Sequence, residues 1–418
     1  MTKIIRERAM NAFRAGLAAA DPTHAMQLAL ANHPLPAPKN DGTRFIIAFG
    51  KAAVAMAKSV LENQGGIKTE ILVVTNYENA VEMPRVEVIA SGHPIPDQNG
   101  LMASEKIAKM MRSAGADDVV VALISGGGSA LLPAPVGELT LEEKMRVNDL
   151  LLKNNLEITQ MNLVRQNLSY LKGGKLTELA APAPITSYIL SDVIGDDLNV
   201  IASGPTAQAI GPASEARALL QERDLWELLP TTAKTILESP SPARVQGVNA
   251  QNHLIGSNSN SAQAMAREIN ATYIGAPLVG EVGEAIQTCL VRIEQEDKSK
   301  PIALVWGGET TVEVKGTGKG GRNQELAIRF ALEASKAGLD GDWCFLSGAS
   351  DGRDGPTDAA GGLVGPGTLG RLQKAGGNLA ALLENNDSYQ ALSLAGDLIK
   401  IGATGTNVAD LQVFIRNP

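Results

Sequence analysis

The chain has 418 residues, of which 44% are hydrophobic and 20% charged, a composition typical of folded proteins and not of disordered ones. At ~150 residues per domain, this length predicts roughly two to three domains. The net charge of −8 excludes a bulk positive field for nucleic acid or an anionic membrane, although small anions can still bind locally. Aromatic residues make up only 3%, so we expect a small ligand and not a stacked base or glycan.

The cellular setting is indicated by the cysteines and by the lack of long apolar segments. Cys289 and Cys344 are too few for a disulfide framework, and neither lies in a Cys-x-x-Cys metal pair. The first 26 residues mix charged and apolar residues at helical spacing, unlike a signal peptide. No stretch approaches the ~20 apolar residues of a membrane span. We therefore expect a cytoplasmic protein without membrane or nucleic-acid partners.

Short β-rich runs alternate with helical patterns from residue 45 onward, which predicts strand–helix alternation and a mostly parallel sheet. The 119–124 run is apolar throughout, so helices are expected to cover both faces of that strand. The 311–314 run alternates and is expected at an edge or in antiparallel pairing. The expected strands are 45–49, 71–74, 86–89, 119–124, 188–190, 254–255, 273–274, 302–306, 311–314, 344–346 and 411–415.

Two helices and one domain boundary have clear local patterns. Thr140 and Glu143 have capping-box spacing, which predicts a helix over 141–154, and a second helix is expected over 323–336. A Pro- and Ser-rich stretch at 238–243 is the best boundary. We therefore divide the chain into domains 1–240 and 241–418.

A run of small residues follows the strand predicted at 119–124: Ser125, Gly126, Gly127, Gly128 and Ser129. Three glycines allow backbone N–H groups to turn toward an anion without obstruction by Cβ atoms, as in a phosphate cradle. A tight connection would require the same glycines, so both interpretations stay open. Pro133 and Pro135 prevent a long helix here, which excludes the Rossmann and Walker arrangements of a phosphate on a full helix.

Lys51 follows the strand predicted at 45–49 and opens a predicted helix over 52–63. A lysine in the first turn opposes the helix dipole, so local stability does not explain its position. A bound phosphate or carboxylate would explain it, and a solvated lysine is the alternative.

Lys319 and Arg322 lie in a glycine-rich segment, 316–322, at the start of the helix predicted over 323–336. Its glycines formally match the G-x-G-x-x-G pattern of dinucleotide sites. The preceding 311–314 run is not a buried first strand, so dinucleotide binding is disfavoured. A flexible loop that clamps a phosphate or carboxylate is the favoured interpretation, and a solvated basic loop is the alternative.

Three carboxylates, Asp192, Glu309 and Asp351, each follow a predicted strand. Such carboxylates can hold Mg²⁺ or accept a hydroxyl proton, but each is equally suited to a turn or a cap. His93 also follows a strand and is interpreted as a structural or binding contact, since no metal spacing or Ser/His/Asp order accompanies it.

Glycines, cations and carboxylates at strand ends are typical of phosphoryl transfer, which depends on positioning and charge neutralisation. The chain lacks the Walker A pattern and the H-R-D and D-F-G elements of protein kinases. A kinase built from these parts would belong to another lineage.

Segments along almost the whole chain closely resemble the class II glycerate 2-kinases, whose C-terminal part is called the MOFRL domain. The resemblance is carried by Ala48–Lys51, Ser91–Asp97, Ile124–Ala130, Asn162–Ser169 with Lys172–Lys175, Ser191–Asp197, Ala202–Thr206, Gly307–Thr310, Gly320–Glu325, Ser350–Ala360 and Gly405–Val408. It implies an N-terminal Rossmann-like three-layer α/β/α domain and a C-terminal α/β domain with a mixed sheet. It also implies phosphorylation of D-glycerate by ATP with Mg²⁺, giving 2-phosphoglycerate in a cleft between the domains.

The resemblance also implies roles for individual residues. Lys51 and Arg322 correspond to the family's catalytic lysine and arginine, with Asp351 as an acidic partner. The two cations would neutralise the transferring phosphoryl group or bind the glycerate carboxylate, and Asp192 or Asp351 would hold Mg²⁺ or accept the hydroxyl proton. Substrate or nucleotide binding is expected at His93, Ser125, Gly126, Gly127, Gly128, Ser129, Glu309 and Lys319.

The chain departs from the family pattern at Gln166-Asn167, where a basic residue and His are usual, and at Ile194, where Pro is usual. The first departure puts contacts of the Arg165 segment in doubt. Two alternatives remain: an NAD(P)H-dependent hydroxypyruvate reductase, a name that family members often carry, and a non-catalytic nucleotide or sugar-acid sensor. A homodimer is an expectation that the residues alone do not decide.

Overall fold

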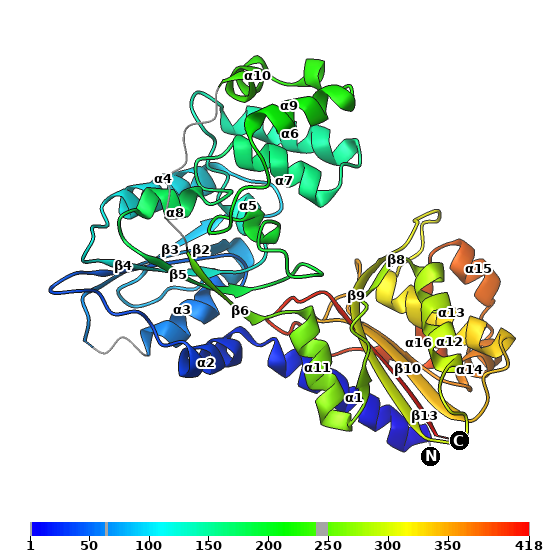
Figure 1. Ribbon diagram of the computed structural model, residues 1–418. Helices are drawn as coiled ribbons and strands as arrows, with labels where there is room; N and C mark the ends of the chain where they lie inside the picture. Colours follow the sequence, from blue (N-terminus) through cyan, green and yellow to red (C-terminus); the bar gives the residue numbers. More distant parts are fainter. Residues whose placement is uncertain (1, 63–65, 240–249, 418) are drawn as a thin grey trace. The chain divides into compact units, whose positions relative to one another are not determined.

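A computed structural model describes residues 2–62, 66–239 and 250–417 of the protein. They form two compact units (Figure 1). The central unit is Ala25–Ile255, and the terminal unit combines Met1–His24 with Gly256–Pro418. The boundary expected between 240 and 241 lies outside the described residues and stays a prediction. The units are not two consecutive segments, because the first helix packs in the terminal unit.

The central unit contains a six-stranded sheet in the order β3-β2-β1-β4-β5-β6. Its strands are β1 (Arg44–Phe49), β2 (Thr69–Asn76), β3 (Glu87–Ser91), β4 (Val119–Ile124), β5 (Ile185–Leu190) and β6 (Gln251–Gly256). Parallel pairing joins β3, β2, β1, β4 and β5. The chain leaves β1 toward β2, whereas β4 lies on the other side of β1, so the strand order reverses there. This Rossmann-like order confirms the predicted fold class. In open α/β sheets, ligands generally bind at the carboxyl ends of the strands where the order reverses, which here are β1 and β4.

Helices cover both faces of this sheet because alternate side chains of β1 point in opposite directions. Phe45, Ile47 and Phe49 pack with α4 (Gln98–Arg112) and α8 (Lys175–Ala180). Ile46 and Ala48 pack on the other face with α2 (Pro22–Asn32) and α3 (Ala53–Leu61). These contacts confirm the three-layer arrangement (Figure 1).

A helical group with its own apolar core follows β4 along the chain. Leu151, Val164, Leu220 and Leu237 are buried in this core. The predicted capping box is confirmed. The Thr140 hydroxyl accepts a hydrogen bond from the Glu143 backbone N–H, and the Glu143 carboxylate accepts one from the Thr140 backbone N–H. The helices of this segment are α5 (Gly128–Leu131), α6 (Leu141–Lys153), α7 (Ile158–Asn167), α9 (Ala213–Glu222) and α10 (Thr231–Glu238), with short 3₁₀ turns at Ile201–Ser203 and Trp226–Leu228.

The terminal unit contains a mixed sheet in the order β12-β11-β10-β13-β9-β7, with β8 beside β9. Its central strand β13 pairs antiparallel with β9 and β10, whereas β7 and β8 run parallel to β9. The expected mixed sheet is thereby confirmed. The strands are β7 (Thr272–Tyr273), β8 (Leu278–Glu281), β9 (Ile302–Thr311), β10 (Asp342–Ala349), β11 (Gly361–Val364), β12 (Leu398–Ile399) and β13 (Asp410–Asn417).

Helices again cover two faces, as alternate residues of β13 show. Phe414 packs with α12, α13 and α16, whereas Val413 and Ile415 pack with α1 and α11. Figure 1 shows α1 beside α11 along the strands, although they are far apart in the sequence. The helices are α1 (Thr2–Ala19), α11 (Asn258–Ile269), α12 (Val282–Glu294), α13 (Arg322–Lys336), α14 (Thr368–Lys374), α15 (Leu379–Glu384) and α16 (Ser388–Ala395).

One strand prediction in this unit is wrong. Strands were expected at 302–306 and 311–314, but a single strand, β9, runs through Gly307 and Gly308. These glycines do not end the strand; they allow close packing. A Cβ on Gly307 would lie 1.9 Å from Asn258 Oδ1, and one on Gly308 would lie 2.0 Å from the Leu278 oxygen. Glu309 is therefore a strand residue and not a loop residue.

We expect Phe13→Ala to lower the free energy of unfolding by about 3–5 kcal/mol, because it removes a buried ring of α1 that contacts Gly348 of β10. Ile4→Ala on the same helix is the control, since Ile4 is 67% exposed and its loss should change that energy by less than about 0.5 kcal/mol. Urea denaturation measures both. Equal effects would contradict the packing of α1 in the terminal unit.

Candidate active site

The loops that follow β1 and β4 are joined by hydrogen bonds at the reversal of strand order. The Lys51 backbone N–H donates to the Gly126 carbonyl over 2.9 Å, and the Ala52 N–H donates to Ser125 Oγ over 3.1 Å. Gly50, with a φ of +123°, has no room for a side chain, since a Cβ would lie 2.1 Å from Ser125 Oγ. Lys51 is thus held beside the glycine loop, in the turn just before α3 and not within its first turn.

The glycine loop, Ser125–Ser129, is surrounded by three of the residues expected at the site. A Cβ on Gly127 would lie 3.0 Å from the His93 ring and 3.3 Å from Lys51 Cγ. A Cβ on Gly126 would lie 2.0 Å from Asp192 Oδ2. Glycines at these positions allow the loop to lie directly against a lysine, a histidine and a carboxylate. The structure therefore brings together every site residue that the sequence analysis placed in the central unit.

A cavity of about 170 Å³ opens beside this loop. His93, Gly127 and Ser129 form part of its wall. Ser129 Oγ lies 2.9 Å from Ser203 Oγ, which donates in turn to Asn162. Apolar parts of the wall come from residues such as Met145 and Leu168 and from nearby prolines.

Three cations also line this cavity, and the sequence analysis did not select them: Lys144, Arg165 and Lys172. Their hydrogen-bond partners are neutral. Lys144 Nζ donates to the Leu168 carbonyl over 2.8 Å, and Lys172 Nζ to the Leu132 carbonyl over 2.5 Å. Arg165 Nε donates to Asn148 Oδ1 over 2.9 Å. A signal existed in the sequence, since Arg165 and Lys172 lie in segments that carry the family resemblance, but nothing there showed that they face one cavity with Lys144.

Burial lowers the pKa values of basic groups in this region, because a cation loses its hydration there. Burial, with a smaller contribution from Arg165, lowers the pKa of Lys172 to about 7. The pKa of Lys144 is also lowered, first by burial and then by Lys172. Burial and the nearby Lys51 charge lower the pKa of His93, which favours a neutral imidazole at pH 7.

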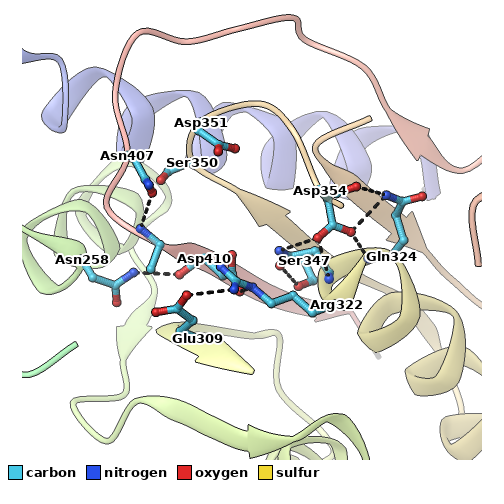
Figure 2. A network of polar contacts seen from close by, with 12 residues as sticks. Asn258, Glu309, Arg322, Gln324, Ser347, Ser350, Asp351, Asp354, Asn407 and Asp410 are labelled. Carbon is cyan, nitrogen blue, oxygen red and sulfur yellow. Dashed lines mark hydrogen bonds and ion pairs between the residues drawn. The ribbon is translucent and has the colours of Figure 1, made fainter. Parts of the chain in front are cut away.

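The terminal unit contains a second polar cluster, centred on Arg322 (Figure 2). Arg322 Nε and Nη2 donate to the Asp410 carboxylate over 2.6 and 3.0 Å, and Nη1 donates to Glu309 over 2.8 Å. Asp410 is fully buried, whereas a third of the Arg322 side chain is exposed. Burial opposes the charge on Arg322, but the bonds to Asp410 prevail and raise its pKa above the ordinary value. The guanidinium therefore stays charged.

A buried carboxylate holds the helix that begins at Arg322. Asp354 accepts hydrogen bonds from the backbone N–H groups of Asn323 and Gln324 over 3.2 and 2.8 Å. These are otherwise unpaired donors at the start of α13. A Cβ on Gly321 would lie 2.3 Å from the Asp354 carboxyl carbon, so the glycine permits this contact. Figure 2 shows Asp354 between Gln324 and Ser347 at the helix start.

Other residues expected at the site have different surroundings. Asp351 accepts from the Arg353 backbone N–H over 2.9 Å, and it makes no hydrogen bond or ion pair with Arg322 in the described part of the chain (Figure 2). The partners of Arg322 are Asp410, which the sequence analysis missed, and Glu309. Lys319 is exposed in the glycine-rich loop, and its backbone N–H donates to Asp387.

The glycine-rich loop 316–321 is held in place by the connection between α15 and α16. Backbone N–H groups of Lys315 and Gly316 donate to Asn386 Oδ1, and that of Thr317 donates to Asn385 Oδ1. Cβ atoms on Gly316 and Gly318 would lie 2.4 and 2.5 Å from backbone atoms of Asn385. Its glycines therefore serve close packing, and the loop is anchored where a flexible one was expected.

The described residues contain no group of three or more His, Cys, Asp or Glu side chains that could hold a metal ion. Mg²⁺ in phosphoryl-transfer sites is commonly held by only one or two carboxylates together with substrate phosphates. Asp192, next to Gly126, fits that role. Every helix in the described part of the chain is too short or too polar for a membrane span.

Comparison with known proteins identifies the family. Residues 8–238 match a domain of unknown function, DUF4147, and residues 302–410 match the MOFRL family. A glycerate 2-kinase from Pyrococcus horikoshii is 37% identical over 90% of this chain and 87% of its own length. The chain belongs to the MOFRL-type, class II glycerate kinase family.

Other relatives agree with this assignment, with one difference in name. A crystal structure of a glycerate kinase from Thermotoga maritima is 33% identical, with a TM-score of 0.89 over 99% of this chain and 100% of that one. An Agrobacterium vitis protein with the provisional name hydroxypyruvate reductase is 37% identical over 96% of this chain and 92% of its own length. Both names therefore occur among similar proteins.

Lys172 should make stability depend on pH. Its pKa is about 7 when folded and near 10.5 when exposed, so the unfolded chain binds more protons between these pH values. The free energy of unfolding should therefore rise across this window with a contribution of up to about 1.4 kcal/mol per pH unit. Lys172→Met should lose this contribution, whereas Lys153→Met, at an exposed site, should keep it. Urea denaturation from pH 6 to 10 measures the difference, and parallel curves for wild type and Lys172→Met would contradict the burial of a titrating lysine.

Arg322→Met should lower the free energy of unfolding by roughly 3 kcal/mol, because it leaves the buried Asp410 carboxylate without its counter-ion. Adding Asp410→Asn should recover part of this loss, since a neutral amide is less costly to bury than a carboxylate. Denaturation of the single and double variants measures the coupling. A double variant less stable than Arg322→Met would show that the pair is not coupled in this way.

Proposed function

We propose that the protein is a glycerate 2-kinase that transfers the γ-phosphoryl group of ATP to the 2-hydroxyl of D-glycerate and releases ADP and 2-phosphoglycerate. The observation that carries the proposal is the convergence of Lys51, His93 and Asp192 on one glycine loop at the reversal of strand order. Ligands of open α/β sheets bind at this position. Similarity to glycerate kinases over most of the chain supports the choice of substrate.

In the proposed reaction the 2-hydroxyl oxygen attacks the γ-phosphorus, the bond from that phosphorus to the ADP oxygen breaks, and the hydroxyl proton passes to a carboxylate. The transition state carries negative charge on the phosphoryl oxygens, so cations aimed at these oxygens lower the barrier. Lys51 supplies one such charge. Only its backbone carbonyl accepts a side-chain hydrogen bond, from Asn79, and within the described residues its ammonium group has no hydrogen bond or ion pair, which leaves it available to a ligand.

The glycine loop would contribute backbone N–H groups to the phosphates. Its glycines let Asp192, His93 and Lys51 lie against the loop, so these side chains would stand beside the bound phosphates. Asp192 would hold Mg²⁺ or accept the proton. When bound, Mg²⁺ would neutralise charge on the β- and γ-phosphates. Asp351 is retained as the alternative carboxylate for either role.

Arg322 is proposed as a second charge-stabilising group. Its guanidinium has one edge committed to Asp410 and another to Glu309, and a third of the side chain is exposed. Asp410 and Asp354 orient it, the first directly and the second through the start of α13. A planar guanidinium held in this way can form paired hydrogen bonds with a phosphate or carboxylate. Lys319 and Glu309 remain proposed nucleotide or substrate contacts.

The hydroxypyruvate reductase alternative requires a dinucleotide site, and the geometry disfavours one. The chain has two G-x-G-x-x-G matches, at 316–321 and at 365–370. The first packs its glycines against Asn385 and Asp354. The second follows β11, which pairs antiparallel with β10 and β12 and is therefore not the first strand of a parallel βαβ unit. At the end of β4, helix α5 has four residues, too few for the long helix on which a dinucleotide phosphate binds. NADH oxidation with hydroxypyruvate tests this alternative, and ATP and glycerate binding without turnover would establish the sensor.

Lys51→Ala should lower kcat/KM for glycerate phosphorylation by at least ~10², since a single electrostatic stabiliser contributes about 3 kcal/mol to the transition state. The melting temperature should be unchanged because the Lys51 ammonium has no partner within the described residues. Lys58→Ala, at an exposed site on α3, is the matched control. An ADP-release assay measures the rates, and phosphorus NMR identifies the phosphorylated hydroxyl. Near-normal turnover of Lys51→Ala would remove Lys51 from the mechanism, and 3-phosphoglycerate as product would refute the 2-kinase assignment.

A further inference from the structure

The cavity beside the glycine loop has an unusual charge balance. Lys144, Arg165 and Lys172 line it, and no Asp or Glu is among its lining residues. The three cations make hydrogen bonds to two backbone carbonyls and one amide, and none of them forms an ion pair within the described residues. Lys172 is only 3% exposed. Burying cations without a counter-ion is unfavourable, and burial accordingly lowers the pKa of both lysines. An anion in the cavity would favour their charged forms and supply the missing counter-ion.

We propose that this cavity is the acid-binding subsite of the enzyme, in which Lys144, Arg165 and Lys172 bind the carboxylate of the hydroxy-acid substrate. The inference rests on the proposed function and goes beyond it, because it assigns the carboxylate to these three cations and not to Lys51 or Arg322. Lys51 and Arg322 then keep only the charge-stabilising roles proposed above.

The size and chemistry of the cavity favour a small acid over a nucleotide. Pockets for drug-sized ligands have volumes of about 300–1,000 Å³, whereas this cavity has about 170 Å³. A three-carbon acid fits such a volume, but a nucleoside triphosphate does not. The guanidinium fork of Arg165 and two ammonium groups match a carboxylate, and Met145 and Leu168 offer apolar contacts to a short carbon chain.

The position of the cavity also explains why the hydroxyl next to the carboxylate would react. His93, Gly127 and Ser129 line the same cavity, and Gly127 lies against Lys51. An acid whose carboxylate is held by the three cations carries its 2-hydroxyl on the adjacent carbon, inside the cavity that Gly127 and Ser129 of the glycine loop also line. A neutral His93 could accept a hydrogen bond from the substrate in this position.

The test compares Arg165→Met and Lys172→Met with wild type in binding and in turnover. Each variant should raise KM for D-glycerate by at least ~10-fold, since a charge-assisted hydrogen bond is lost, and leave KM for ATP within about twofold. Calorimetry without ATP should show the same loss of glycerate affinity. Glyceramide, which has no carboxylate, should bind weakly to wild type and should be almost unaffected by the substitutions. Lys153→Met, an exposed cation of α6, is the control and should leave both KM values unchanged.

Several results would overturn the assignment. Unchanged glycerate affinity in both variants, or equal losses for glycerate and glyceramide, would show that these cations do not bind the carboxylate. A raised KM for ATP alone would make the cavity a phosphate site. If neither variant folds, equal affinities of wild type for glycerate and glyceramide would refute the proposal. If wild type phosphorylates glycerate and the cavity variants behave normally, only the subsite is refuted. If wild type neither binds nor phosphorylates glycerate, the proposed function is refuted and the subsite with it.

Discussion

The candidate site of the central unit depends on the pairing of β1 with β4. These two parallel strands are adjacent, although the chain continues from β1 to β2, which lies on the other side of β1. The loops after β1 and β4 therefore lie side by side at the carboxyl ends of the strands. The ladder continues beyond the strands through the bond from the Lys51 N–H to the Gly126 carbonyl. A lysine and a glycine loop that are 75 positions apart in the chain thereby share one backbone framework. The position of the glycine loop depends on this framework, because the helix that follows it, α5, has only four residues.

The two units handle buried charge in opposite ways. In the terminal unit, Arg322 is matched by Asp410 and Glu309, which fixes its position and keeps it charged. In the central unit, the cations of the cavity have only neutral partners, and burial lowers the pKa of Lys172 to about 7. The first arrangement orients a group before the ligand arrives. The second lowers the pKa of basic groups that a bound anion would restore to their charged forms, which is how a binding site differs from a structural ion pair.

The glycines show where local patterns are informative and where they mislead. Gly126 and Gly127 were expected to turn backbone N–H groups toward an anion or to form a tight connection, and the side chains of Asp192, His93 and Lys51 lie against them. Gly307 and Gly308 were interpreted as the end of a strand, but they lie inside β9 because its neighbours come too close for a Cβ. A glycine indicates that another group lies close to the backbone. Which group it is, and from which side it approaches, depends on segments distant in the chain.

The amino-acid sequence by itself determined the fold class, the capping box of α6, most strands of both sheets and the family, since these depend on local periodicity and on motifs that survive in linear order. Only the tertiary structure determined which side chains contact one another. Asp410 pairs with Arg322, and Lys144, Arg165 and Lys172 line one cavity. Likewise, α1 packs on the sheet of the terminal unit, although the sequence analysis assigned it to the N-terminal domain. Such pairings join residues far apart along the chain, and local patterns carry no information on how packing brings them together.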